Sequence, residues 1–236
     1  MRLVLWIASL VPIAAQAAPA KSDFSPSEVR SLTAKYADCV VGERGPLAWR
    51  IMRDNPGNEV IIKRYPAILI PSCIAEIKPW GLDMRFPGDI YVNALAEALF
   101  RKFLTGVSLK DLASVPALTH RPFPVIDEAK LPKNRRLAEV ARERFNNTLG
   151  TAYLSRFGEC VARQTPDGAK DLLSSAMDSE AEKAAFSRLQ SALGKCLSSG
   201  TQLKFGKSVL RGAIAMNYVR LADAAYPDRF PMTAVR

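Results

Sequence analysis

Apolar residues recur along this chain at the three- and four-residue spacing that places them on one face of an α-helix. The first such stripe follows Ser25-Pro26-Ser27-Glu28, where a capping-box pattern is combined with proline at the first helical position. The apolar positions of this helix are Val29, Leu32, Tyr36, Cys39 and Val40. A second helix is expected to open at Pro46.

The second half of the chain shows a similar order of elements. A long helix is expected to begin near residues 132–134 and to continue through Phe157 and Cys160. A shorter helix follows Thr165-Pro166, and another follows the capping-box pattern Ser179-Glu180-Ala181-Glu182. Each half then closes with a helix that has alanines at the centre of its apolar stripe, which favours close approach of a neighbouring helix.

Residues 60–73 are the least regular part of the first half. Pro66 and Pro71 interrupt the apolar pattern, so a kinked or short helix is expected there. Val60-Ile61-Ile62 is also compatible with extended backbone.

These patterns predict an all-α protein of two tandem four-helix modules, at residues 21–104 and 134–225. Residues 105–133 contain four prolines and are expected to form a linker or crossover, with room for a short helical turn at residues 108–113. Residues 226–236 are expected to be an irregular tail.

The two modules resemble each other closely enough to predict a gene duplication. The first block that matches contains an aromatic residue, an acid, cysteine and valine in the same order, and two further blocks follow in sequence. The pairs are Tyr36-Ala37-Asp38-Cys39-Val40 with Phe157-Gly158-Glu159-Cys160-Val161, Cys73-Ile74 with Cys196-Leu197, and Ala94-Leu95-Ala96 with Ala213-Ile214-Ala215.

Four cysteines allow three disulfide pairings. The first two are 34 residues apart (73 − 39) and the last two are 36 apart (196 − 160). If each copy was once a self-sufficient unit, its two cysteines pair with each other, which predicts the disulfides Cys39–Cys73 and Cys160–Cys196. Because the chain has no C-x-x-C spacing, a metal or redox role is disfavoured, and we expect neither a metal nor a cofactor.

The N-terminus has the pattern of a secretory signal peptide: Arg2, an apolar run broken by Pro12, and a stretch of small residues. Cleavage is expected after Ala17, which makes residues 1–17 the leader, with Ala20 as the alternative. The run is shorter than the roughly 20 residues that span a bilayer, and we expect no membrane span after cleavage. The protein is therefore expected to be exported, to the periplasm first and to the medium as the alternative.

Composition supports a folded, basic protein. Hydrophobic residues form 48% of the chain and charged residues 24%, which is typical of a globular fold. The formal charge of +10 favours acidic partners, although it also serves solubility alone. We expect an anionic envelope polymer or another exported protein in preference to nucleic acid.

The chemistry-bearing residues give no strong catalytic motif. His120 is the single histidine and lies in a proline-rich stretch, so it is expected to be a solvated loop residue. Hydrolysis by paired carboxylates would draw on Glu76, Asp83, Asp89 and Glu97, which are expected to be surface charges or caps.

A weak candidate for an anionic-ligand surface lies at the start of the long helix. Its cations are Lys133, Arg135, Arg136, Arg142 and Arg144, preceded by Lys130. An ordinary solvated face is the favoured interpretation. A cation-phenylalanine pair occurs in both modules, as Arg85-Phe86 and Lys204-Phe205, and we expect each phenylalanine to pack at a helix start.

The aromatic-x-acid-Cys-Val block, the second cysteine about 35 residues later and the segment Ala94-Leu95-Ala96-Glu97-Ala98-Leu99-Phe100-Arg101 together form a recognisable pattern. It resembles a group of exported, internally duplicated, disulfide-bonded helical proteins of alphaproteobacteria, sphingomonad-like in character and uncharacterised as a group. The resemblance implies an exported helical protein and implies no catalytic residues.

We therefore expect a non-enzymatic envelope protein that binds a ligand or partner. One alternative is a lysozyme-like cell-wall hydrolase, which requires a cleft with a buried glutamate. The other is an inhibitor or immunity-type protein that binds another exported protein.

Overall fold

The computed structural model describes residues 25–55, 58–77, 90–110, 112, 114–197 and 205–227. All regular structure in these ranges is helical, which confirms the predicted all-α class. The α-helices are α1 (Pro26–Asp54), α2 (Asn58–Arg64), α3 (Pro71–Ile77), α4 (Ile90–Leu99), α5 (Arg135–Gln164), α6 (Pro166–Ser174), α7 (Glu180–Cys196) and α8 (Lys207–Ala225). Short 3-10 turns occupy Pro66–Ile68 and Glu128–Lys130, and a π-helical turn, Phe100–Leu104, continues α4.

The start of α1 is the predicted capping box, and a second helical segment of α1 begins just before Pro46, close to where a second helix was predicted. The Ser25 N–H donates to the Glu28 carboxylate at 2.7 Å, and the Glu28 N–H donates back to the Ser25 hydroxyl. Arg44 leaves the helical conformation, with φ at −130° and ψ at 33°, so α1 consists of two helical segments joined by a kink. Pro46 has no N–H to donate to the Gly42 carbonyl four residues earlier. The Lys102 ammonium donates to that carbonyl and to the Val41 carbonyl instead, each at 3.3 Å.

Residues 58–77 form short helical pieces, as the two prolines predict. Pro66 opens a 3-10 turn and Pro71 opens α3, so proline stands where its missing N–H costs nothing. Val60, Ile61 and Ile62 lie within α2, and the extended alternative is therefore wrong for them.

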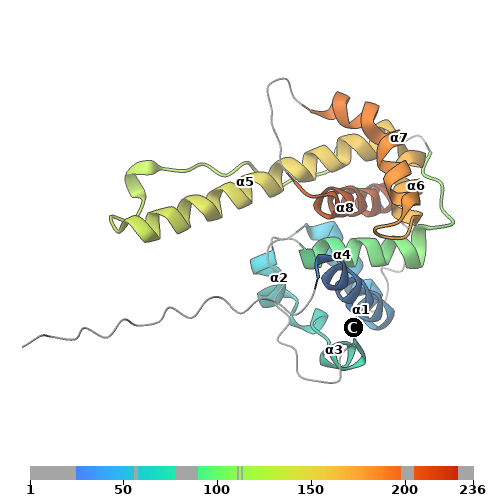
Figure 1. Ribbon diagram of the computed structural model, residues 1–236, viewed down its shortest axis with the longest axis horizontal. Helices are drawn as coiled ribbons and strands as arrows, with labels where there is room; N and C mark the ends of the chain where they lie inside the picture. The colour runs from blue at the N-terminus through green and yellow to red at the C-terminus, as the bar shows by residue number, and fades with distance from the viewer. Residues whose placement is uncertain are drawn as a thin grey trace, which may run out of the picture.

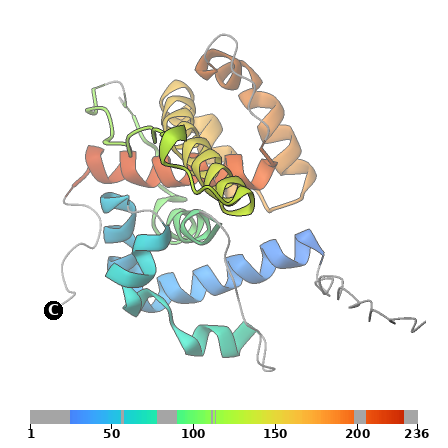
Figure 2. The same ribbon diagram turned by 90° about the vertical axis from the view of Figure 1, so that its left-hand side faces the viewer.

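Helix α8 is the centre of the molecule (Figures 1 and 2). It packs against α4 on one side and α5 on the other, with α1 and α6 beside it. Residues Leu210 to Asp223 are buried without interruption, so α8 has no solvent face along most of its length. The sequence predicted one buried apolar stripe on this helix, whereas neighbouring helices bury it on all sides.

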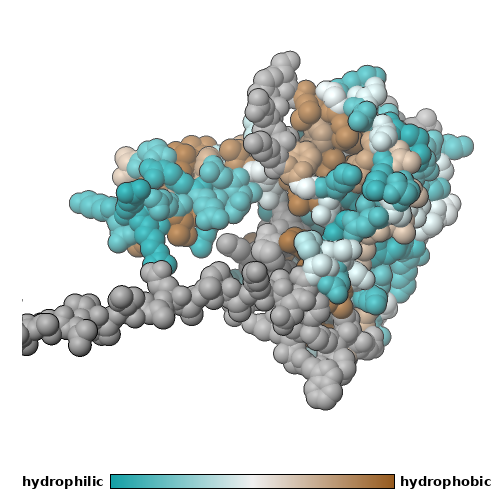
Figure 3. Space-filling view, viewed as in Figure 1, coloured by the Kyte–Doolittle hydropathy of each residue, from teal (hydrophilic) through white to brown (hydrophobic). Residues whose placement is uncertain are grey.

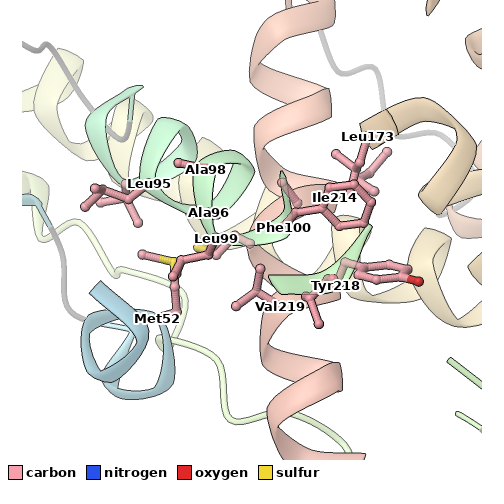
Figure 4. Close-up of a cluster of buried hydrophobic side chains, with 14 of the residues drawn as sticks. Met52, Leu95, Ala96, Ala98, Leu99, Phe100, Leu173, Ile214, Tyr218 and Val219 are labelled. Atoms are coloured by element: carbon pink, nitrogen blue, oxygen red, sulfur yellow. The ribbon is translucent and has the colours of Figure 1, made fainter. Parts of the chain in front are cut away.

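The two halves of the chain share one hydrophobic core. Leu99 and Phe100 from the first half meet Ile214, Tyr218 and Val219 of α8 (Figure 4). The rings of Phe100 and Tyr218 are 5.4 Å apart and nearly perpendicular, an arrangement that aromatic pairs prefer. Burial in this core raises the pKa of the Tyr218 phenol to about 12.

Glycines allow the central helices to approach closely. A Cβ added at Gly212 of α8 would lie 2.4 Å from Cβ of Asn93 on α4. A Cβ added at Gly158 of α5 would lie 2.4 Å from the carbonyl oxygen of Ala213 on α8. Both positions therefore require glycine for this packing.

The disulfides pair as predicted. Cys39–Cys73 joins α1 to α3 with the two Cα atoms 5.7 Å apart, and Cys160–Cys196 joins α5 to α7 at 5.8 Å. Each bond therefore closes a loop within one half of the chain, and the halves are held together by packing and by ion pairs such as Arg211–Glu97.

Residues 105–133 are partly built into the fold. Val107, Leu109 and Leu112 are buried in the core, and the described residues between 108 and 113 form no helix. The chain then returns beside the N-terminal half of α5, and together they project from the body of the molecule (Figure 1). The described helices include none that is long and apolar enough to cross a membrane.

Candidate functional site

A cavity of about 400 Å³ lies where α1, α4 and α8 meet. Its volume is in the range of pockets that bind small molecules. The described lining comes from both halves of the chain and is mainly apolar. It consists of Pro26, Val29, Arg30, Thr33, Ala34, Ile90, Asn93, Ala94, Glu97, Arg101, Met177, Ser208 and Val209.

The cavity exists because small side chains face it from two neighbouring helices. Ala34 of α1 and Ala94 of α4 both line it, and Ser208 contributes a short side chain at the start of α8. Val29, Ile90 and Val209 supply larger apolar surfaces, and Val29 and Ile90 remain partly exposed. The site is therefore an apolar hollow with access to solvent.

A buried charge network lies against one wall of the cavity. The side chain of Arg211 is 2% exposed, and its Nε donates to Glu97 Oε2 at 2.9 Å while its Nη1 donates to Glu182 Oε1 at 2.9 Å. Its Nη2 donates to the backbone carbonyls of Leu173 and Ser175. The guanidinium is thus satisfied on all sides, as buried ions require.

The two arginines in the cavity lining are also paired. Arg30 forms ion pairs with Asp178 and Glu182, the latter at 3.3 Å. Arg101 pairs with Asp38 at 2.7 Å and lies 3.7 Å from Glu97. No charged side chain in the described lining is therefore without a counterion.

The uncommitted polar groups of the cavity are neutral. The Asn93 amide and the Ser208 hydroxyl form no side-chain hydrogen bond with another described residue, and both line the hollow. An amide and a hydroxyl each offer donor and acceptor capacity to a bound molecule.

Glu97 was expected to be a surface charge, and this expectation is wrong. Its side chain is only 11% exposed, because α4 lies against α8 and Arg211 reaches it from there. The other acids of that group give no second carboxylate: Asp83 and Asp89 lie outside the described residues, and so does the side chain of Glu76. Glu97 is the single carboxylate in the described lining.

His120 was expected to be a solvated loop residue, and the structure corrects this as well. Its side chain is 9% exposed and lies against α5. Nε2 is 2.5 Å from Glu159 Oε2, and Nδ1 is 2.8 Å from the Ser155 hydroxyl. Glu159 also accepts the Leu118 N–H at 3.1 Å and the Arg163 Nε–H at 2.8 Å.

These bonds fasten the crossover segment to α5. Arg163 donates to the carbonyls of Leu112, Val115 and Pro116, and Arg220 donates to that of Thr119. A neutral His120 satisfies both of its contacts when Nε2–H donates to Glu159 and Nδ1 accepts the hydroxyl proton of Ser155.

Burial sets the ionisation of this cluster. It lowers the pKa of His120, and the nearby Glu159 carboxylate offsets this only in part. For Glu159, burial acts to raise the pKa, but the hydrogen bonds from Leu118, His120 and Arg163 outweigh it and hold the pKa below its ordinary value.

Ser155, His120 and Glu159 form a hydrogen-bonded row that resembles a catalytic triad. The serine of this row, however, is too buried to act as a nucleophile. A nucleophile must reach a substrate, and Ser155 is only 2% exposed. We therefore interpret the row as a structural clamp.

The basic surface predicted from the sequence is exposed, and only some of its cations form ion pairs. Arg135 pairs with Glu139 at 3.0 Å and Arg142 pairs with Glu128 at 2.7 Å. The side chains of Lys133, Arg136 and Arg144 form no ion pair with another described residue.

Two further expectations are resolved in part. Phe205 packs near the start of α8 with its ring 6.0 Å from that of Phe157, whereas Arg85, Phe86 and Lys204 lie outside the described residues. Within the described chain, no cluster of three or more histidine, cysteine, aspartate or glutamate side chains could hold a metal ion.

Comparison with protein-family models, with curated proteins and with solved structures finds no match for this chain.

Proposed function

We propose that this chain is an exported, non-enzymatic binding protein that holds a small, uncharged and mainly apolar molecule in the cavity between α1, α4 and α8. The observation that carries the proposal is the charge balance of the lining. Arg30, Arg101 and Glu97 already have counterions, whereas the Asn93 amide and the Ser208 hydroxyl are uncommitted.

A charged ligand would have to compete with these existing pairs. The Arg211–Glu97 and Arg30–Glu182 pairs are largely buried, and separating either would leave an uncompensated charge, which is strongly unfavourable, whereas the Arg101–Asp38 pair is partly exposed. A neutral ligand leaves the pairs intact, gains burial of its apolar surface and places one or two polar groups against Asn93 and Ser208. The chemistry of the lining therefore favours an apolar body with one or two hydrogen-bonding groups.

The export part of the proposal is supported by the leader pattern and by the two disulfides, since disulfides persist in oxidising compartments. Expression in a bacterium with intact export would test it. Intact mass should correspond to a chain that begins after Ala17 or Ala20, and an unprocessed mass in the cytoplasmic fraction would contradict export.

Binding is tested with two fluorescent probes that share an aromatic scaffold. N-phenylnaphthylamine is neutral and carries one N–H, whereas anilinonaphthalene sulfonate adds a negative charge. We expect the neutral probe to bind one site per chain and the sulfonate to bind at least tenfold more weakly.

A cavity-filling variant locates the site. Ala34→Trp should abolish binding of the neutral probe, because Ala34 lines the hollow. Ala224→Trp makes the same chemical change at an exposed position of α8 and should leave binding unchanged. Equal binding by the wild-type protein and Ala34→Trp would contradict the proposal.

The hydrolase alternative has its own discriminating result. A paired-carboxylate mechanism needs two carboxylates, and the described lining supplies Glu97 alone. Release of reducing ends from peptidoglycan by the wild-type protein, lost in folded Glu97→Gln, would favour the hydrolase over the binding protein.

A further inference from the structure

The N-terminal half of α5 and the segment that returns beside it form an arm, defined here as residues 121–150. The arm projects from the body of the molecule (Figure 1). None of its residues belongs to the hydrophobic core, although all of them are described. Ala138 is buried, but three larger apolar side chains of the arm face solvent: Val125 is 92% exposed, Leu137 56% and Val140 47%. Figure 3 shows hydrophobic and hydrophilic side chains interleaved over this arm.

The charges on the arm separate into two sides of α5. Arg135 and Arg142 lie on one side, where Glu139 and Glu128 neutralise them. Arg136, Leu137, Val140 and Arg144 lie on another side, because residues three and four apart share a helix face. We name these four residues the basic-apolar face. The exposed Glu143, seven residues after Arg136, lies at the border between the two sides.

The basic-apolar face has no partner within the described chain. Arg136 and Arg144 form no side-chain hydrogen bond or ion pair with another described residue. Leu137 and Val140 stand between these two cations along the helix and remain about half exposed. Cations beside exposed aliphatic side chains are one feature of helices that lie in a membrane interface.

We propose that the basic-apolar face of α5 docks this protein on an anionic lipid surface. Arg136 and Arg144 contact lipid phosphates, and Leu137 and Val140 enter the boundary between headgroups and acyl chains. The aliphatic residues favour lipid over a soluble polyanion, which gives them no apolar environment. The unpaired cations disfavour a second copy of the chain, because like charges would meet.

Vesicle flotation tests the proposal. The processed protein is used, with its N-terminus checked by intact mass, because an uncleaved leader would itself bind lipid. We expect flotation with vesicles that contain phosphatidylglycerol and none with pure phosphatidylcholine vesicles. The binding should weaken steeply as salt is raised.

Two matched double variants remove the same net charge from opposite sides of α5. Arg136→Gln with Arg144→Gln should lower the partition coefficient about 25-fold, since each basic residue near an anionic surface contributes about fivefold. Arg135→Gln with Arg142→Gln removes cations that already have counterions and should lower it by no more than about threefold. Equal losses in the two variants would mean that net charge alone drives binding and would overturn the assignment to this face.

A third double variant separates lipid from other partners. Leu137→Ser with Val140→Ser keeps every charge and should lower lipid partitioning about tenfold. Unchanged vesicle binding in this variant would identify the face as a polyanion site, and a concentration-dependent dimer without vesicle binding would identify it as a contact between copies. Either result would overturn the lipid proposal, and neither depends on whether the cavity binds its probe. Circular dichroism should show all three variants folded, because the substituted side chains are exposed.

Discussion

Arg211 of α8 donates its Nε–H to Oε2 of Glu97 on α4 at 2.9 Å, and this bond joins the two halves of the chain inside their shared core. The same guanidinium holds Glu182 at the start of α7. Three helices are thereby fixed by one cation that water does not reach. The cavity wall is part of the same arrangement, because Glu97 faces both Arg211 and the hollow.

Removing that cation should be severely destabilising. Arg211→Met keeps the approximate length of the side chain but leaves Glu97 and Glu182 buried without their main partner, which should cost about 3–5 kcal/mol of unfolding free energy. Arg188→Met removes the exposed pair with Asp171 on the surface and should cost less than about 1 kcal/mol. Urea unfolding at neutral pH measures both, and losses of similar size would contradict the account.

The His120 clamp should make stability depend on pH in a defined direction. Burial lowers the pKa of His120 in the folded state, so the unfolded chain binds the proton more readily. The stabilising contribution is complete above the ordinary histidine pKa of about 6.5 and is lost as the pH falls below it. Glu159 adds its own loss only at lower pH, because its pKa lies below the usual carboxyl value.

The measurement is a series of urea unfolding curves from about pH 8 to about pH 5, a range that isolates the histidine from the carboxyl groups. The wild-type free energy of unfolding should decrease across this range. His120→Gln retains a neutral hydrogen-bonding side chain and should give a much flatter dependence. Parallel slopes for the two proteins would rule out His120 as the source.

Two glycines of α5 should respond in opposite directions to the same substitution. Gly158→Ala places a methyl group 2.4 Å from the carbonyl oxygen of Ala213 and should destabilise the protein by about 1–3 kcal/mol. Gly150→Ala meets nothing within 4 Å and should stabilise it by about 0.5–1 kcal/mol through helix propensity. Thermal unfolding of both variants tests the close approach of α5 and α8, and stabilisation by Gly158→Ala would show that the helices are farther apart.

The two disulfides should contribute about equally to stability. Their loops are similar, with sequence separations of 34 and 36 residues, so the chain-entropy model gives about 4 kcal/mol for each. Replacing either pair with serines should lower the free energy of unfolding by comparable amounts. Mass mapping of non-reduced peptides should recover Cys39 with Cys73 and Cys160 with Cys196, and a Cys39–Cys160 peptide would contradict the fold.

Local features of the fold could be predicted from the sequence because their causes are local. Ser25 and Glu28 cap each other across three residues, and Ser179 accepts the Glu182 N–H in the same way. The predicted internal repeat selected one disulfide pairing of three, and the structure has that pairing. Proline correctly predicted the short helices before Cys73 and a helix boundary near Pro46, but not that Lys102 would donate to the carbonyls at that boundary from a distant turn.

The geometry of the candidate site and of the His120 clamp could not be predicted in this way, because it depends on contacts between segments that are distant in the sequence. A periodic apolar stripe shows one buried face, whereas α8 is buried all round and carries Arg211 and Asn217 into the core. His120 and Glu159 are 39 residues apart, and only the return of the crossover segment brings them together. The one available signal was the placement of Arg211, Asn217, Arg220 and Asp223 within a helix that is otherwise mainly apolar.

The close contact of Asn93 with Gly212 has a consequence for the origin of the chain. On the predicted repeat these residues occupy equivalent positions, 119 apart (212 − 93), in helices α4 and α8. In a two-fold symmetric dimer, a residue near the axis meets its own copy. We predict from the repeat that this contact descends from a dimer of identical subunits fused into one polypeptide, after which glycine on one side and asparagine on the other were free to specialise.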